Sequence, residues 1–155
     1  MSEMAYEGLN MEQCIEENGE VMCCSSGTSM YPMLRHRKDM VVVKKVDRPL
    51  KKYDVPLYRL KSGKLVFHRI LKITDNGYII RGDNLLEKEY NITDDMIIGV
   101  LKGFYRGKKY YDCEKSVIYK IYIRINRIIY PLRYIWKKYI LPFLVKIKHI
   151  ILGRK

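Results

Sequence analysis

The sequence predicts a mainly β fold, in which a compact domain of short, mostly antiparallel strands precedes a basic amphipathic helical tail. Short β-branched or aromatic runs separated by turn residues occupy the middle of the 155 residues. Apolar residues recur at helical spacing after residue 117. The net charge of +13 is uneven, because residues 115–155 hold 11 Lys or Arg and no acid. We therefore divide the chain into an acidic N-terminal segment (1–20), a β-rich domain (21–106) and a basic tail (107–155).

The N-terminal segment carries six glutamates and no Lys or Arg. Its residues between Leu9 and Glu16 allow one or two helical turns, which Asn18-Gly19 would end. So many charges are costly in a bilayer, so we do not expect this segment to span one. It also lacks the basic and then apolar pattern of a secretory signal.

The four cysteines indicate a reducing compartment. They are Cys14, Cys23, Cys24 and Cys113, and none has zinc-ligand spacing. The adjacent pair Cys23-Cys24 would form a disulfide only with awkward geometry. Free thiols without a signal sequence are typical of proteins kept under reducing conditions.

Five or so short strands are expected in the middle of the chain. The runs that predict them are 21–24, 40–43, 54–59, 65–73, 78–81 and 96–104. Pro56 indicates an edge strand or a bulge, because proline cannot donate to a sheet. Asp75-Asn76-Gly77 is the strongest hairpin signal, and it joins the run 65–73 to the run 78–81.

A serine lies on a glycine-led turn, in Gly27-Thr28-Ser29-Met30-Tyr31-Pro32-Met33-Leu34. A serine hydroxyl becomes a nucleophile only with a neighbouring base, oxyanion donors and a group that orients the base. His68 and Asp83 are the candidates for base and orienting group. Each also has a plain structural explanation, since serine and aspartate commonly satisfy turns and a strand histidine is commonly half-buried.

Taken together, these residues carry a resemblance to a known family. Gly27-x-Ser29-Met30-x-Pro32-x-Leu34 resembles the nucleophile box of the signal peptidase I and LexA-like serine peptidase superfamily. Val66-Phe67-His68-Arg69-Ile70 resembles the general-base box of its endoplasmic-reticulum and archaeal branch, in which histidine replaces lysine. Gly82-Asp83-Asn84 and Ile98-Gly99-Val100 resemble the boxes that follow. The resemblance covers about residues 21–104.

The resemblance implies a serine-type endopeptidase with a Ser–His(–Asp) mechanism. Ser29 would attack the scissile carbonyl, His68 would take its proton, and Asp83 would orient the imidazole. The backbone N–H of Ser29 would donate to the oxyanion, with Gly27 and Met30 beside it in the substrate-binding turn. The substrate would be an extended leader or signal segment paired with a strand edge. No metal or cofactor is implied.

The chain departs from the family pattern in three places. Relatives in the histidine branch often carry a further aspartate after the Gly-Asp-Asn box, where this chain has Glu87 and Glu89. The third catalytic member is therefore Asp83 or one of these glutamates. The box after Met40 reads Lys52-Tyr53-Asp54-Val55 in place of the usual Gly-Asp start. Family members that process exported proteins have a membrane-spanning helix before the serine, whereas the acidic segment 1–20 of this chain is not expected to span a membrane.

The pattern of the tail favours a membrane surface as its partner. Lys120, Arg124 and Arg127 share one helical face, and Ile, Leu, Tyr and Trp residues cover the others. The longest charge-free run, 139–145, is much shorter than a bilayer requires. We therefore expect interfacial association, with the cytoplasmic face favoured. Pro131 and Pro142 are each expected to start a new helical segment.

Several alternatives stay open. The tail could also be a helix packed on the body. It fits a nucleic-acid-binding segment less well, because its many Ile and Leu residues would make no useful contact with nucleic acid. A cytoplasmic regulatory or self-cleaving peptidase would need a DNA-binding helix pair or an Ala-Gly or Cys-Gly cleavage site before the serine, and neither is found. A catalytically inactive membrane- or nucleic-acid-binding protein would keep the fold without the chemistry.

Overall fold

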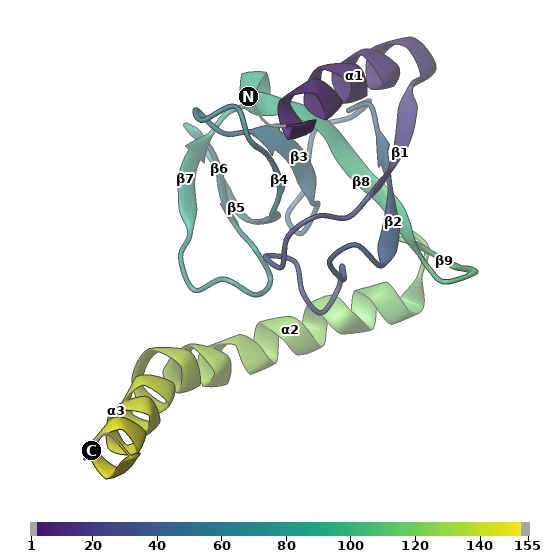
Figure 1. Cartoon of the computed structure of the whole chain (residues 1–155). Helices are drawn as coiled ribbons and strands as arrows, with labels where there is room; N and C mark the ends of the chain where they lie inside the picture. Colours follow the sequence, from purple (N-terminus) through teal and green to yellow (C-terminus); the bar gives the residue numbers. More distant parts are fainter. Residues whose placement is uncertain (1–2, 153–155) are drawn as a thin grey trace. The chain divides into compact units, whose positions relative to one another are not determined.

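The computed structural model describes the backbone of residues 3–152 and the side chains of residues 11–147. The chain forms two compact units that divide between Tyr119 and Lys120. The first unit is an antiparallel β domain that begins with a helix, and the second is helical (Figure 1). The structure confirms a β-rich chain with antiparallel sheets and a C-terminal helix, which is compatible with the predicted mainly β class.

Within the described residues, nine strands form two antiparallel sheets. The larger sheet has the order β1-β2-β8-β3-β4, with β9 paired to β8, and the smaller sheet has the order β5-β6-β7. The strands are β1 (Glu20–Cys24), β2 (Asp39–Lys44), β3 (Pro56–Arg59), β4 (Leu65–Phe67), β5 (Arg69–Thr74), β6 (Gly77–Arg81), β7 (Glu89–Ile92), β8 (Ile97–Arg106) and β9 (Lys109–Asp112). A 3-10 turn, η1 (Asp94–Met96), precedes β8.

One apolar cluster joins the two sheets. Its buried members come from β3 and β8 of the larger sheet, from all three strands of the smaller sheet, and from the segment before β3. They are Leu50, Tyr58, Ile70, Tyr78, Ile80, Ile92 and Val100. Burial of a side chain of this size stabilises a fold by about 1.5–3 kcal/mol. This cluster therefore fixes the smaller sheet against the larger one.

The helix α1 (Glu3–Asn18) is longer than the one or two turns predicted. It ends at Gly19, where φ is +76°, and the Gly19 N–H donates to Ile15 O at 2.9 Å, a glycine-capped helix end. Ile15 is buried, and a Cβ on Gly99 would lie 3.3 Å from its Cδ1. Contacts of this kind hold α1 on β1 and β8 (Figure 1).

The predicted strand 65–73 is two strands in the structure. β4 ends at Phe67 in the larger sheet, and β5 begins at Arg69 in the smaller sheet. His68 is the residue at the crossing. The single-strand prediction was wrong because alternation along a chain indicates which face a side chain takes, whereas distant partners decide which sheet each half joins.

Two further details of the β domain bear on the predictions. The predicted hairpin is confirmed, since Thr74 pairs with Gly77, whose φ is +107°. Pro56 is not at an edge, because β3 lies between β8 and β4. The register of β3 against β8 shifts between Leu57 and Tyr58, so the bulge is present beside the proline.

The second unit continues the helix α2 (Val117–Ile135) through a π-helical turn, η2 (Trp136–Ile140), into α3 (Leu141–Leu152). The backbone of Ile135 and Leu141 stays α-helical, so the hydrogen-bond pattern changes without a break. Pro131 lies inside α2 and does not start a segment, whereas Pro142 lies in the first turn of α3. In the described part of the chain, no helix is long and apolar enough to cross a membrane.

The tail was predicted to begin at residue 107, but the residues just after this point belong to the β domain. Lys109–Asp112 forms β9 and pairs with β8, from Gly103↔Asp112 to Arg106↔Lys109. The helix begins only at Val117. The boundary was placed where the basic residues begin, whereas the helix begins about ten residues later.

Candidate active site

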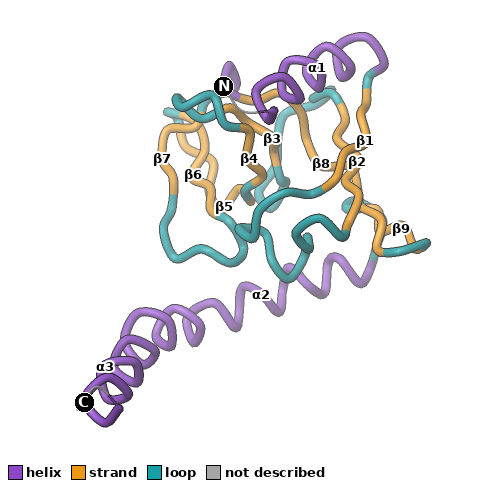
Figure 2. Tube along the Cα trace, in the orientation of Figure 1, coloured by secondary structure: helices purple, strands orange, loops and turns teal. Residues whose placement is uncertain are grey.

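The long connection between β1 and β2, residues 25–38, is called the serine loop because it carries Ser29 (Figure 2). The loop is closed at its base, where the Ser25 N–H donates to Asp39 O at 2.9 Å. The Ser25 hydroxyl donates to Arg35 O at 2.6 Å, and the Arg35 guanidinium forms an ion pair with Asp39 at 2.6 Å. These bonds define the loop even though it has no regular secondary structure.

Three apolar side chains anchor the serine loop in the core. Met30, Met33 and Leu34 are each at most 4% exposed. Met30 was predicted to lie beside the substrate, but its side chain is buried, so only its backbone is available there. The anchors leave Ser29 half-exposed on the turn. The apolar positions of the resembled motif thus have a structural purpose, which is to hold the serine in place.

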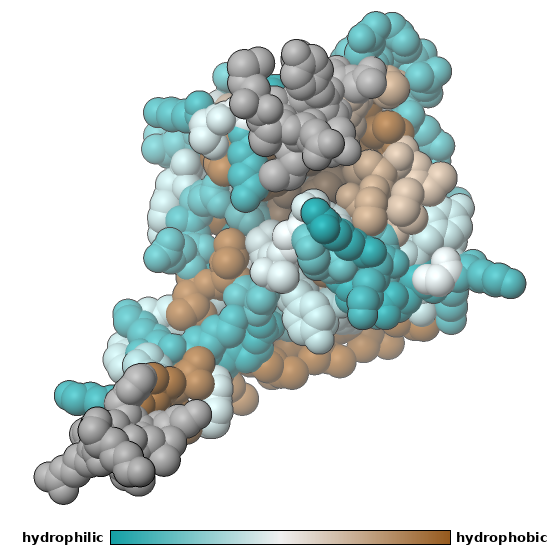
Figure 3. Space-filling view, viewed as in Figure 1, coloured by the Kyte–Doolittle hydropathy of each residue, from teal (hydrophilic) through white to brown (hydrophobic). Residues whose placement is uncertain are grey.

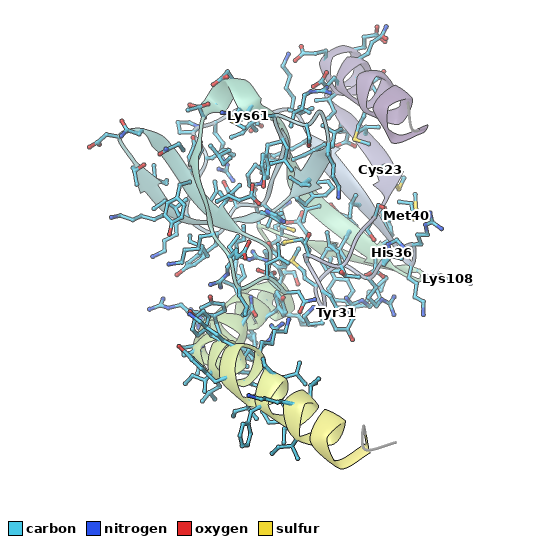
Figure 4. All side chains as sticks on the ribbon, turned by 60° about the vertical axis from the view of Figure 1, so that its left-hand side comes forward. Cys23, Tyr31, His36, Met40, Lys61 and Lys108 are labelled. Carbon is cyan, nitrogen blue, oxygen red and sulfur yellow. The ribbon has the colours of Figure 1, made fainter. Side chains whose placement is uncertain are left out.

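Gly27 shapes the turn before the serine. Its φ of +85° is in the left-handed region that favours glycine, and a Cβ there would meet nothing within 4 Å. The Gly27 N–H donates to Nδ1 of His36 at 2.9 Å, so it is not available to an oxyanion. Figure 4 shows His36 and Tyr31, two exposed side chains of this loop. In the described structure, the N–H groups of Ser29 and Met30 donate no hydrogen bond and remain available.

The turn that follows β6 is bonded to the serine turn. The Asn84 N–H donates to Ser29 O at 2.7 Å, and the Asn84 side chain donates to Thr28 O at 3.2 Å. A Cβ on Gly82 would lie only 2.7 Å from Ser29 O, which requires glycine at this close approach. The structure therefore brings residues 82–84 against the candidate nucleophile.

His68 lies between β4 and β5 with one ring nitrogen fully engaged. Its Nδ1 is 2.7 Å from Glu89 Oε1 and 2.8 Å from the Tyr58 hydroxyl. The Tyr58 hydroxyl donates its single proton to Glu89 Oε2 at 2.8 Å. The Tyr58 oxygen can therefore only accept a hydrogen bond from His68 Nδ1. This assigns the imidazole proton to Nδ1.

The other ring nitrogen of His68, Nε2, has no hydrogen-bond partner among the described residues. The residue is 4% exposed, so this nitrogen lies in a largely buried environment. A neutral imidazole with its proton on Nδ1 presents a lone pair at Nε2. This is the arrangement that a general base needs.

Two opposing influences set the protonation of His68. Burial, the larger, lowers the pKa of its imidazole, and the Glu89 carboxylate raises it, so that the pKa lies below the ordinary 6.5. Burial and the bond to Glu89 raise the pKa of Tyr58 far above its ordinary value, so the phenol keeps its proton. At neutral pH the imidazole and the phenol are therefore both neutral.

Asp83 was predicted to orient His68, and the structure gives it a different partner. Its carboxylate accepts from Arg69 Nε at 2.8 Å and from Arg69 NH2 at 2.7 Å, and both side chains are 3% exposed. Neighbouring residues of an extended chain point to opposite faces, so the side chains of His68 and Arg69 reach different partners. Glu89 takes the orienting position, and Glu87, the other glutamate considered, is exposed.

Ser29 and His68 are connected through this ion pair. Ser29 O is bonded to Asn84, the neighbour of Asp83, and Arg69 is the neighbour of His68. In the part of the chain that the structure describes, no hydrogen bond joins the Ser29 hydroxyl to His68.

The described side chains contain no group of three or more His, Cys, Asp or Glu residues that could hold a metal ion. The four cysteines are free thiols. No protein-family model matches the chain, and no curated protein is significantly similar to it. The chemistry of the site is therefore inferred from its geometry.

Proposed function

We propose that the protein is a serine endopeptidase of the signal peptidase type, with Ser29 as nucleophile, His68 as general base and Glu89 as the group that orients the base. The observation that carries this proposal is the environment of His68. One nitrogen is held by a carboxylate at 2.7 Å, and the other has no hydrogen-bond partner among the described residues. A serine turn with two available N–H groups supports it.

The proposed reaction is acyl transfer through a covalent intermediate. The Ser29 hydroxyl oxygen attacks the scissile carbonyl carbon while His68 Nε2 accepts the hydroxyl proton. The carbonyl electron pair moves to the oxygen, which the N–H groups of Ser29 and Met30 stabilise. Collapse of this intermediate breaks the C–N bond, and the leaving amine takes the proton from Nε2. Water, deprotonated by His68, then attacks the acyl carbon; the bond to the Ser29 oxygen breaks, and that oxygen takes the proton back from His68.

Glu89 and Tyr58 keep His68 ready for both steps. The imidazolium that forms after proton transfer lies 2.7 Å from the Glu89 carboxylate, which stabilises its charge. The Tyr58 hydroxyl holds the second oxygen of that carboxylate at 2.8 Å, so the carboxylate cannot rotate away. Because the pKa of His68 is lowered, the base is unprotonated at neutral pH before substrate arrives.

The substrate that fits is an extended segment of a polypeptide, such as a leader. β1 and β4 are the two ends of the larger sheet's main path, β1 pairing only with β2 and β4 only with β3. β1 leads into the serine loop, and β4 leads into His68. An extended peptide that adds to either edge would therefore be guided toward a candidate catalytic residue.

The test is cleavage of a quenched leader peptide, with variants matched to the site. Ser29→Ala and His68→Ala are expected to lose cleavage, and Ser26→Ala, an exposed serine of the same loop, is expected to keep it. A serine-reactive probe read by intact mass does not depend on the choice of peptide. It should label wild type once, and Ser29→Ala not at all. Equal labelling of Ser29→Ala and wild type would exclude the proposed nucleophile.

A further inference from the structure

A stripe of large, exposed apolar side chains runs along α2. Its members recur at spacings of three and four residues, so they share one face of the helix. They are Ile118, Ile121, Ile125, Ile128, Leu132 and Ile135, and each is at least 47% exposed. We call these six residues the apolar stripe. Brown atoms along α2 mark it in Figure 3.

Exposed apolar residues continue beyond α2. Trp136, Tyr139, Phe143 and Leu144 are each at least 46% exposed. Soluble surfaces rarely show contiguous apolar area on this scale unless a partner covers it. The described part of α2 and α3 therefore needs a partner that accepts aliphatic and aromatic side chains over a length of several helical turns.

The charge beside the apolar stripe is of one sign. Lys120, Arg124 and Arg127 lie on the adjacent face, and no acidic residue follows Glu114 in the sequence. Partial burial and, secondly, the nearby charge of Arg133 lower the pKa of Lys137. The partner must supply negative charge close to apolar material.

Aromatic side chains of this helix contact one of its cations. Lys138 Nζ donates to the Tyr134 hydroxyl at 2.7 Å and lies 5.1 Å and 5.6 Å from the ring centres of Tyr134 and Tyr139. Rings with one polar end and a long cationic side chain are typical of the boundary between lipid headgroups and acyl chains.

We propose that the helix formed by α2, η2 and α3 lies in the headgroup region of an anionic lipid bilayer. The apolar stripe reaches the acyl boundary, and the Lys and Arg side chains contact lipid phosphates. A second copy of this chain would bring cations against cations, and nucleic acid would leave six aliphatic side chains in water. This inference goes beyond the proposed peptidase activity and does not depend on it.

The single tryptophan of the chain makes the proposal measurable in the full-length protein. Trp136 is 49% exposed, so its emission should shift to the blue when vesicles of phosphatidylcholine and phosphatidylglycerol are added. Brominated acyl chains should quench it. Vesicles of phosphatidylcholine alone should produce a much smaller shift, and salt should weaken binding to the anionic vesicles.

Paired variants separate insertion from simple charge attraction. Ile128→Lys adds a cation but breaks the apolar stripe, and we expect it to weaken vesicle binding by about tenfold or more. Arg124→Gln should weaken binding about fivefold, as expected for the loss of one cation near an anionic surface. Lys108→Gln removes a cation from the turn between β8 and β9 and is the control expected to bind as wild type.

Three results would overturn the proposal. One is the absence of a Trp136 shift with anionic vesicles. Another is tight binding to a DNA or RNA duplex that Ile128→Lys leaves intact or strengthens, which would assign the helix to nucleic acid. The third is a concentration-dependent shift without vesicles, accompanied by a dimer in sedimentation, which would assign the stripe to a second copy. Ser29→Ala should bind vesicles as wild type does, so failure of the peptidase proposal is distinguishable.

Discussion

Replacing Glu89 by Gln tests the orienting role directly, because the substitution preserves size and removes charge. The Glu89 carboxylate raises the pKa of His68 against the lowering effect of burial. An opposite charge at this distance changes a pKa by about 1–3 units, so the pKa of His68 should fall further, by about 1 unit or more. The new amide can also donate to Nδ1, which would move the ring proton to Nε2. Loss of the correct tautomer in a comparable triad costs about 10⁴-fold in kcat.

The assay is the pH dependence of kcat/KM for the leader peptide, alongside an NMR titration of the His68 ring. Wild type should gain activity as pH rises through a value below 6.5, because protonated His68 cannot accept the serine proton. Glu89→Gln should shift this rise to lower pH and reduce the plateau by about 10²–10⁴-fold. Glu87→Gln, an exposed neighbour, should leave both unchanged. If Glu89→Gln retains the wild-type profile and plateau, the orienting assignment is wrong.

Three further substitutions have distinct expected outcomes. Tyr58→Phe removes the hydroxyl that holds the proposed orienting carboxylate at 2.8 Å. We expect kcat to fall about tenfold and the free energy of unfolding in urea to fall by about 1 kcal/mol. An unchanged kcat would argue against a positioning role for Tyr58. Asp83→Asn leaves the Arg69 charge buried, so it should lower the free energy of unfolding by about 3–5 kcal/mol, a loss that Arg69→Met combined with Asp83→Leu should partly restore. Gly82→Ala forces a Cβ to within 2.7 Å of Ser29 O, so the serine turn must move. We expect kcat to fall about 10²-fold while the circular dichroism spectrum stays native. A wild-type kcat would show that activity tolerates this movement of the turn.

The sequence correctly predicted elements whose conformation depends mainly on their own residues. The run 40–43 is β-branched, and it lies inside β2. Asp75-Asn76-Gly77 forms the hairpin, because glycine supplies the positive φ that this turn requires. Gly27 likewise has the left-handed backbone of a glycine-led turn. In each case the chain's own conformational preference and the observed structure agree.

Two strands were missed because their pairing with strands distant in the sequence, and not their own residues, determines that they form. β7 (Glu89–Ile92) was not predicted, because Glu-Tyr-Asn-Ile has neither strong alternation nor many β-branched residues. Its register on β6, Ile80↔Glu89, brings Glu89 to the side of the sheet on which His68 lies. β9 was missed because its Lys and Tyr residues follow a basic turn and resemble the start of the tail. The sequence had offered Asp83, Glu87 and Glu89 for this role, and only the pairing of β7 distinguishes Glu89 from the other two.

The buried Arg69–Asp83 ion pair gives the Asp83 carboxylate a structural partner of opposite charge. Arg69 NH2 lies 2.9 Å from the Met33 sulfur of the serine loop, and Arg69 NH1 donates to the Tyr119 hydroxyl at 2.9 Å. The two terminal nitrogens of one guanidinium thus bind the serine loop and the end of the first unit. Because Arg69 follows His68 directly, the same backbone that this buried pair immobilises also presents the imidazole. One buried ion pair is therefore bonded to the loop that carries Ser29 and includes the residue next to His68, although neither of its side chains is a proposed proton carrier.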